Sequence, residues 1–447
     1  MKRFFLIVLL GILLPIAISG QAPISAPVGV SAIFAEFDRM AGLPLWPHFE
    51  PKKLALAIYD GERTFLIRHP SPPSGFVKQG EVWVYPGQHP VMRANTHVDL
   101  AGVPTATLLL QPGGGGDAKS WAATMIHESF HVFQAQRHPD WSGNEMNLYA
   151  YPVDDAGALA LRRLETEALR RARAAPKRED AACWARRALE LRCDRAARLP
   201  ASSVAYERGT ELNEGLASFV QSLALGEAAG PELPAAEWPA EDVRLRIYGV
   251  GPAEAFLLDR FDPSWRGKLE AKTAGLDELL DASLSGQTAT PCAFTSAEEA
   301  TARERAKKDA SRVSQDRRTQ REELLGRAGW KLVLVAGAEP LWPQGFDPWN
   351  IAPLGGSELI HRRWVKLGNG GGVLEILNRE SLTEGAGANP LANGIRKVTL
   401  TGFATEPKIS KSDDSVTIEA EGVTAKLKGA VVERGEQGEK LVTVKLP

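Results

Sequence analysis

The sequence predicts an α+β protein that ends in a separate all-β domain. Two changes of pattern along the 447 residues support this fold class. Residues 118–328 carry apolar side chains mainly at helical spacing, whereas the residues on either side alternate short apolar runs with Gly and Pro turns. We therefore expect four parts: a signal peptide at 1–20, a β-rich part at 21–117, a helical part at 118–328 and a β domain at 329–447.

The first residues have the order of a secretory signal peptide. Lys2 and Arg3 precede an apolar stretch from Phe4 to Ile18, and the small residues Ser19 and Gly20 follow it. This order predicts a secreted or periplasmic protein, and the alternative is an uncleaved N-terminal anchor. No later apolar run is long enough to cross a bilayer, so we expect no other membrane span.

Charge and cysteine content narrow the class of protein further. The formal net charge of −2 argues against nucleic acid as a partner. Three cysteines do not form a disulfide framework. Cys183 and Cys193 would lie about 15 Å apart along one helix, which is too far for a bridge. We therefore predict free thiols.

The β-rich part contains three apolar runs bounded by turn residues. These runs predict strands at 54–60, 81–87 and 103–112. Residues 34–46 predict a short helix that enters a turn. The glycine run at 113–116 lacks the Lys-Ser/Thr pair of a phosphate-binding loop, so we expect a plain loop there, with Asp117 capping the next helix.

The segment 155–198 predicts two Arg-rich helices separated at Pro176. Basic helices can indicate nucleic-acid binding, but acidic residues interleave the arginines here. These acidic residues are Glu165, Glu167, Glu179, Asp180 and Glu190. The mixture predicts a solvated helix surface.

The other helices follow from apolar spacing. The helix that begins after Asp117 should end near His138, and residues 202–225 predict another. Residues 246–261 should begin as a loop and become helical, and 296–325 should form a packed or connecting helix. Beyond residue 329, seven short alternating runs predict a sandwich or a small barrel.

The string HESFH gives the strongest indication of chemistry. His127 and His131 stand four residues apart, so both imidazoles lie on one helix face and can reach one metal ion. Glu128 stands beside them, where it could accept a proton from a metal-bound water. This H-E-x-x-H pattern on an apolar helix predicts a Zn²⁺ site.

A catalytic zinc ion usually takes a third protein ligand. Glu207, Glu211 and Glu214 follow each other at spacings of four and three, which puts them on one helix stripe. Three like charges on one stripe disfavour each other unless a positive group lies nearby, and a divalent metal is such a group. A solvated helix face is the alternative explanation.

The segment N-E-G-L-A-S-F, with Glu214 as its glutamate, resembles the N-E-G-x-A segment of gluzincins, especially their zinc aminopeptidase branch. The resemblance implies a zincin-like metallopeptidase domain with a β-rich and a helical subdomain. It implies that His127, His131 and Glu214 bind Zn²⁺ and that Glu128 is the general base. Glu211 is the reserve candidate for the third ligand.

A longer pattern points in the same direction. HESFHVFQ followed by Y-x-x-x-x-E-x-x-E-G-L-A resembles uncharacterised secreted bacterial peptidases of the zincin-like type, over roughly residues 90–270. The chain departs from the aminopeptidase branch in two respects. The Arg-rich helices separate His131 from Glu214, and the G-x-M-E-N segment that grips a free amino end is absent. The choice between endopeptidase and exopeptidase therefore stays open.

Zinc hydrolases also need a donor to the oxyanion that forms when water attacks the carbonyl. Tyr248, in Y-G-V-G, resembles the Y-x-x-G tyrosine of the aminopeptidase branch, and Tyr206 is the alternative. His97 and His138 are expected in loops or on the surface. The strand ahead of the HESFH helix, within 103–112, could form the edge of the cleft and pair with an extended peptide substrate.

Two non-catalytic alternatives remain. The zinc site could have lost turnover, although an intact Glu128 argues against this. The chain could instead be a cell-envelope binding protein whose β domain binds glycan or protein. The aromatic segment 340–350 would suit such binding, although Trp342 and Trp349 could equally pack the domain.

Overall fold

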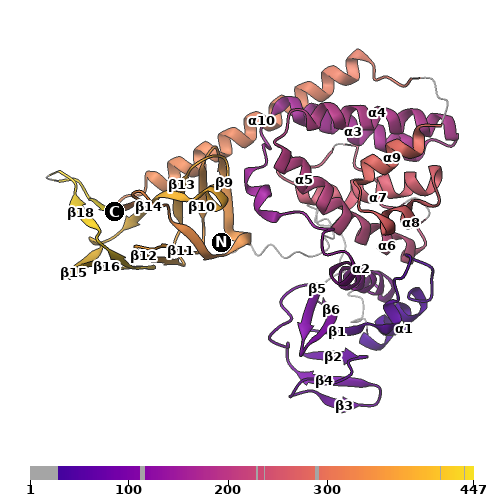
Figure 1. The fold of residues 1–447 in the computed structure, drawn as a ribbon, viewed down its shortest axis with the longest axis horizontal. Helices are drawn as coiled ribbons and strands as arrows, with labels where there is room; N and C mark the ends of the chain where they lie inside the picture. The colour runs from indigo at the N-terminus through magenta and orange to yellow at the C-terminus, as the bar shows by residue number, and fades with distance from the viewer. Residues whose placement is uncertain are drawn as a thin grey trace, which may run out of the picture.

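The computed structural model describes residues 29–110, 116–227, 230–235, 237–286, 291–412, 414–436 and 438–447. The described chain is α+β and contains three sheets, one N-terminal and two C-terminal, with a helical body between them (Figure 1). The expected signal peptide and residues 113–115 of the glycine run lie outside the described residues. None of the helices in the described ranges is long and apolar enough to cross a membrane.

The N-terminal sheet has the order β3-β4-β2-β1-β6-β5. Its strands are β1 Ala55–Tyr59, β2 Arg63–Ile67, β3 Val77–Gln79, β4 Val82–Pro86, β5 Thr96–Leu100 and β6 Val103–Leu109. β1 and β6 are parallel, and the other neighbouring pairs are antiparallel. The helices α1 (Val30–Met40) and α2 (Ala118–Arg137) pack against each other, and their buried residues share one core with β1 and β6.

The expectation that residues 103–112 form the edge of the cleft is wrong. β6 lies between β1 and β5, so its two sides are both paired, and β5 is the edge strand. The cause is a tight hairpin that joins β5 to β6. Ala101 and Gly102 adopt positive φ angles of 52° and 82°, and Asp99 accepts a hydrogen bond from the Gly102 backbone N–H.

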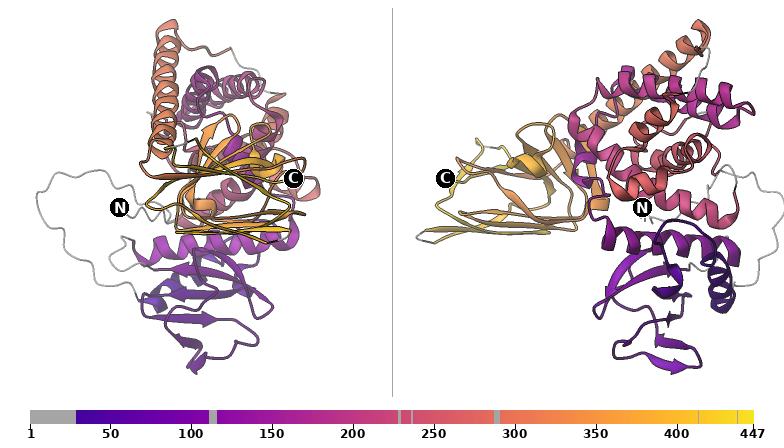
Figure 2. Two further views of the ribbon diagram at one scale, coloured as in Figure 1. Left: turned by 90° about the vertical axis from the view of Figure 1, so that its left-hand side faces the viewer. Right: turned by 45° about the vertical axis from the view of Figure 1, so that its right-hand side comes forward.

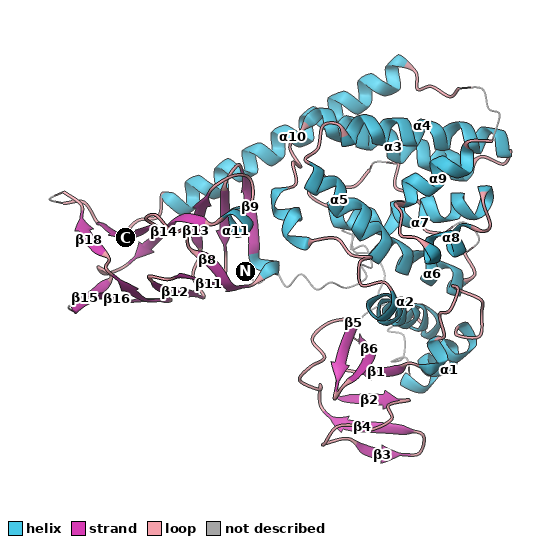
Figure 3. Cartoon of the chain, viewed as in Figure 1, coloured by secondary structure: helices cyan, strands magenta, loops and turns pink. Residues whose placement is uncertain are grey.

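The helical body follows α2 directly (Figure 3). Its helices are α3 Ala156–Ala174, α4 Arg178–Ala196, α5 Ala201–Thr210, α6 Leu216–Leu225, α7 Val243–Phe261, α8 Trp265–Ala271, α9 Leu276–Leu284 and α10 Ser296–Leu325. A 3₁₀ segment (Glu145–Ala150) precedes α3, and a π-helical segment (Glu211–Gly215) joins α5 to α6. Asp117 caps α2 by accepting a hydrogen bond from the Ser120 N–H, as predicted.

The predicted loop at the start of 246–261 is wrong, because α7 is helical from Val243 onward and contains Pro252. Gly251 has a packing role in this helix. A Cβ added to Gly251 would lie 2.6 Å from the Cα atom of Gly215, which belongs to the π-helical segment. Only glycine at this crossing lets the two helices approach so closely.

The prediction of a solvated surface for 155–198 holds for part of the two helices, where Glu179, Asp180 and Glu190 are exposed, but is wrong for three of the arginines. Arg162, Arg192 and Arg195 are 3%, 6% and 1% exposed. Arg195 lies between α3 and α5, where it binds the carboxylates of Glu165 and Glu207. The partners come from the neighbouring helices α3 and α5, so the charge pattern along α4 alone could not reveal that Arg195 is buried and paired.

The prediction of free thiols is wrong for two of the three cysteines. Cys183 in α4 forms a disulfide with Cys292, with the Cα atoms 5.5 Å apart. Cys193 is an exposed free thiol. The two bonded residues are 109 positions apart, so spacing within one helix could not indicate the pair.

The C-terminal part is a β-sandwich. One sheet has the order β18-β19-β7-β14-β13-β10-β9 and the other β15-β16-β17-β12-β11-β8. The strands are β7 Trp330–Val335, β8 Trp342–Phe346, β9 Ile351–Gly355, β10 Glu358–His361, β11 Trp364–Asn369, β12 Gly372–Leu377, β13 Ser381–Gly385, β14 Ile395–Phe403, β15 Lys408–Ser412, β16 Ser415–Ala420, β17 Val423–Lys428, β18 Val431–Arg434 and β19 Leu441–Lys445. Side chains such as Leu334 and Leu374 fill the space between the sheets.

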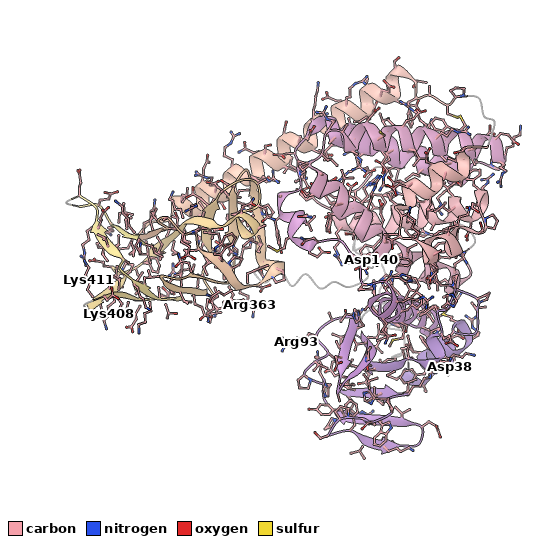
Figure 4. All side chains as sticks on the ribbon, in the orientation of Figure 1. Asp38, Arg93, Asp140, Arg363, Lys408 and Lys411 are labelled. Carbon is pink, nitrogen blue, oxygen red and sulfur yellow. A yellow bond between two sulfur atoms is a disulfide. The ribbon has the colours of Figure 1, made fainter. Side chains whose placement is uncertain are left out.

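Two elements connect the sandwich to the helical body (Figure 2). α10 packs on α3 at its start, and Leu324 near its end contacts Ile360 and Leu382 of the sandwich. Met146 and Tyr149 of the 3₁₀ segment pack against the sandwich core. Lys408 and Lys411 of β15 lie at the far end of the sandwich, away from the helical body (Figure 4).

Candidate metal centre

α2 presents two histidines to the helical body. His127 and His131 are 2% and 8% exposed, and their Nε2 atoms lie 3.1 Å apart. A spacing of one helical turn brings the two rings to one face, as the sequence pattern predicts. Apolar neighbours on α2, among them Ile126 and Phe130, bury the remaining faces of the helix.

Glu214 completes the group from the π-helical segment. Its Oε2 atom lies 3.4 Å from Nε2 of His127 and 3.2 Å from Nε2 of His131. One ligand atom from each of the three residues lies within 4.8 Å of the others, and all three residues are buried. The group could therefore hold a metal ion.

The electrostatics of the group favour a bound cation. Burial opposes the charge on Glu214, but the charge of His131 and hydrogen bonds from both histidines hold the pKa of its carboxyl well below the ordinary value. Burial also opposes the charge on His131, yet Glu214 raises the pKa of that imidazole to about 9. A buried carboxylate beside two ring nitrogens thus attracts a positive charge, which a proton or a divalent metal can supply.

Two glutamine side chains contact the outer nitrogens of the histidines. Nδ1 of His127 lies 3.1 Å from Oε1 of Gln221 in α6, and Nδ1 of His131 lies 2.8 Å from Oε1 of Gln134 in α2. A carbonyl oxygen accepts a hydrogen bond, so each Nδ1 carries a proton and each Nε2 is directed toward the centre of the group. A metal ion would displace the proton by which Nε2 bonds to Glu214, and the ring would then be in the tautomer that a metal ligand requires.

The structure does not bring the three glutamates of the predicted stripe together. Glu207 binds Arg195, and Glu211 receives two hydrogen bonds from Arg192. Only Glu214 reaches the histidines. The π-helical segment has more residues per turn than an α-helix, so it rotates Glu214 away from the face that carries Glu211.

Glu128 is buried beside the charged groups of His127, His131 and Glu214. It is 5% exposed, and burial raises the pKa of its carboxyl, with the nearby Glu214 charge acting in the same direction. The two histidines oppose this shift. A raised pKa brings a carboxylate closer to the range in which it can exchange protons near neutral pH.

Tyr248 lies beside the group and Tyr206 lies further out. The ring of Tyr248 stacks on His127 with the centroids 6.1 Å apart, and burial together with Glu214 raises the pKa of its hydroxyl. Tyr206 donates a hydrogen bond to Glu145 over 3.3 Å. Of the two tyrosines, Tyr248 is therefore the one in contact with a candidate ligand.

Arg244, one turn before Tyr248 on α7, connects the site to its surroundings. Its Nη2 atom donates to Oε1 of Glu214 over 2.6 Å, while Nη1 donates to Glu145. Oε2 of Glu214 is thereby left facing the histidines. No pattern in the sequence indicated Arg244, because its role depends on the crossing of α7 with the π-helical segment.

His97 and His138, which were expected in loops or on the surface, have different surroundings. Burial, followed by the charge of His131, lowers the pKa of His97 in the edge strand β5. His97 is exposed on this strand, which confirms the expectation of a surface position. His138 stacks on Trp141 with the ring centroids 3.8 Å apart and lies 3.0 Å from Glu270, so it has a structural role.

Comparison of the chain with protein-family models, with curated proteins and with solved structures found no match. The functional argument therefore depends on the residues of the site.

Proposed function

We propose that this chain is a zinc-dependent metallopeptidase of the gluzincin type with a zincin-like catalytic domain. The observation that carries the proposal is the buried convergence of His127, His131 and Glu214, with Glu128 adjacent. Two histidines, one carboxylate and a neighbouring base are the donor set of a catalytic zinc site in a hydrolase. A purely structural site would not require Glu128.

The donor set fits Zn²⁺ because both Nδ1 atoms are paired with amide oxygens and both Nε2 atoms face Glu214. When bound, zinc would act as a Lewis acid toward water and toward the scissile carbonyl. Glu128 would accept a proton from the attacking water and deliver it to the leaving amine. The Tyr248 hydroxyl would donate a hydrogen bond to the developing oxyanion.

The edge strand β5 is the element that suits an extended peptide. It is paired on one side only, with β6, and it contacts α2. An unpaired strand edge beside the site offers backbone donors and acceptors to a substrate that adds as a further strand. We propose a peptide or protein substrate on this basis.

A secreted or periplasmic location belongs to the same proposal. The N-terminal residues have the signal-peptide pattern, and disulfides such as Cys183–Cys292 persist in oxidising compartments.

One observation favours the alternative of a cell-envelope binding protein without turnover. Trp342, on the edge strand β8 of the sandwich, is 42% exposed, and an exposed indole is typical of surfaces that bind glycan or protein. Binding of the purified protein to cell-wall material, with no cleavage of any peptide, would support this alternative.

The deciding experiment is metal analysis of the purified mature protein, combined with digestion of a peptide library with and without a chelator. We expect one zinc ion per chain and cleavage that stops on chelation and returns with Zn²⁺. Cuts inside long peptides would indicate an endopeptidase, and loss of single N-terminal residues an aminopeptidase. One bound zinc without any cleavage would contradict the enzymatic part of the proposal.

A further inference from the structure

Gln134 stands one helical turn after His131 on α2 and is 1% exposed. Its side chain makes four contacts in two directions. The Oε1 atom lies 2.8 Å from Nδ1 of His131 and 3.3 Å from Nδ2 of Asn213. The Nε2 atom lies 2.8 Å from the carbonyl oxygen of Leu212 and 3.0 Å from that of Asn213.

These contacts fix which end of the Gln134 amide faces which partner. Backbone carbonyl oxygens only accept hydrogen bonds, so the NH₂ group must face Leu212 and Asn213. Oε1 must therefore face His131, and a flipped amide would set three oxygen atoms against one another. The four contacts satisfy the hydrogen-bonding capacity of the amide in one orientation.

The two carbonyl groups belong to the π-helical segment, directly before Glu214. A π-turn disturbs the regular backbone ladder and leaves carbonyl groups that need another donor. The Gln134 NH₂ group supplies that donor, so the segment that carries Glu214 is held to the helix that carries His131. One side chain thus controls the relative position of two candidate ligands.

We propose that Gln134 is a positioning residue that holds His131 and the Glu214 segment in one hydrogen-bonded unit, which presets the geometry of the metal site. The proposal rests on the proposed function, because it assigns a role toward the same metal. It also assigns the conformation of the π-helical segment to Gln134, a residue that does not itself bind the metal.

The test compares two isosteric substitutions. Gln134→Glu keeps an acceptor for His131 but places an oxygen against the carbonyls of Leu212 and Asn213. Gln221→Glu is the matched control, because Gln221 likewise accepts from a candidate ligand, His127, through Oε1. A carboxylate acceptor behind a histidine ligand strengthens metal binding where nothing else is disturbed.

Zinc affinity is measured at pH 8 by competition with a chromophoric chelator, using Zn²⁺ alone as the probe. We expect Gln134→Glu to weaken zinc binding by about 10-fold or more, because the Glu214 segment loses its two hydrogen bonds to α2. We expect Gln221→Glu to leave zinc binding unchanged or to make it tighter. Hydrogen exchange of the metal-free proteins should also show faster exchange at residues 211–215 in Gln134→Glu alone.

If Gln134→Glu does not fold, Asn213→Ser removes one contact of the same amide and should weaken zinc binding in the same sense. Folded variants with wild-type zinc affinity and unchanged exchange at 211–215 would overturn the positioning role. Absence of zinc binding by the wild-type protein would instead overturn the proposed function, and the exchange measurement would still report whether Gln134 holds the π-helical segment.

Discussion

The assignment of Glu214 rather than Glu211 as the third ligand can be tested by a pair of isosteric substitutions. Glu214→Gln removes the carboxylate that lies 3.2 Å from Nε2 of His131. Glu211→Gln removes a carboxylate that is fully buried against Arg192. The two residues are three positions apart on one continuous helical stretch, so each substitution is the natural control for the other.

The expected size of the two effects follows from their surroundings. The apparent free energy of zinc binding at structural sites with four ligands is about 10–16 kcal/mol, or roughly 3 kcal/mol per ligand. Loss of one ligand in Glu214→Gln should therefore weaken zinc binding by about 100-fold. Glu211→Gln should leave zinc affinity unchanged. It should lower the free energy of unfolding by about 1–3 kcal/mol, because one of the two hydrogen bonds from Arg192 is lost and the other has a neutral acceptor. Arg192 keeps Glu254 at 2.9 Å, and burial already raises the pKa of Glu211, which limits the loss.

Zinc competition titrations give the first quantity, and urea unfolding of the metal-free proteins, followed by circular dichroism, gives the second. Loss of zinc affinity in Glu211→Gln, with wild-type affinity in Glu214→Gln, would refute the assignment and with it the rotation attributed to the π-helical segment.

Three further predictions concern other parts of the structure. Glu128→Gln should keep zinc at wild-type stoichiometry and lose nearly all peptide hydrolysis in the library digest, whereas full activity would remove Glu128 from the mechanism. Arg195→Met removes the cation bound to Glu207 and one of the cations bound to Glu165, which keeps Arg246 at 3.0 Å, and should cost about 3–5 kcal/mol in urea unfolding. Arg321→Met, at a partly exposed pair, should cost about 1 kcal/mol or less, and equal costs in the two variants would contradict the role of the buried ion pairs in stability. Burial lowers the pKa of His361 from 6.5 to about 4, so the unfolded chain binds a proton at this residue at a higher pH than the folded protein does. The free energy of unfolding should therefore fall by about 3 kcal/mol as the pH is lowered from 6.5 to 4. A His361→Gln variant with the same pH dependence would exclude His361 as the cause.

Local sequence patterns were sufficient for the elements that depend on local interactions. The cap at Asp117, the break between α3 and α4 at Pro176 and the long helix α10 all follow from residues within a few positions of each other. The meeting of His127 and His131 is of the same kind, because one α-helix fixes their separation.

The errors arose where a partner distant in sequence determines the structure. The charge pattern of the Arg-rich helices predicted a solvated surface. In the interior, however, Arg192 pairs with a carboxylate of α7 and Arg195 with a carboxylate of α5. The start of 246–261 was expected to be a loop, but it is helical, and Gly251 permits a close crossing with Gly215. Local composition carries no information about such partners.

The third ligand shows how these long-range contacts act on the site. In a regular α-helix, Glu211 and Glu214 would share one face, and Arg192 would attract both. Arg192 binds Glu211 in the interior, while the π-helical segment turns Glu214 toward α2. The position of Glu214 therefore depends on contacts on two sides of its helix. The arginines of α4 bind the helix on one side, and the Gln134 amide and the histidines of α2 bind it on the other. Weakening the contacts of Gln134 should therefore change the metal site before it unfolds the protein, whereas weakening the Arg192–Glu211 contact should lower the stability and leave zinc affinity unchanged.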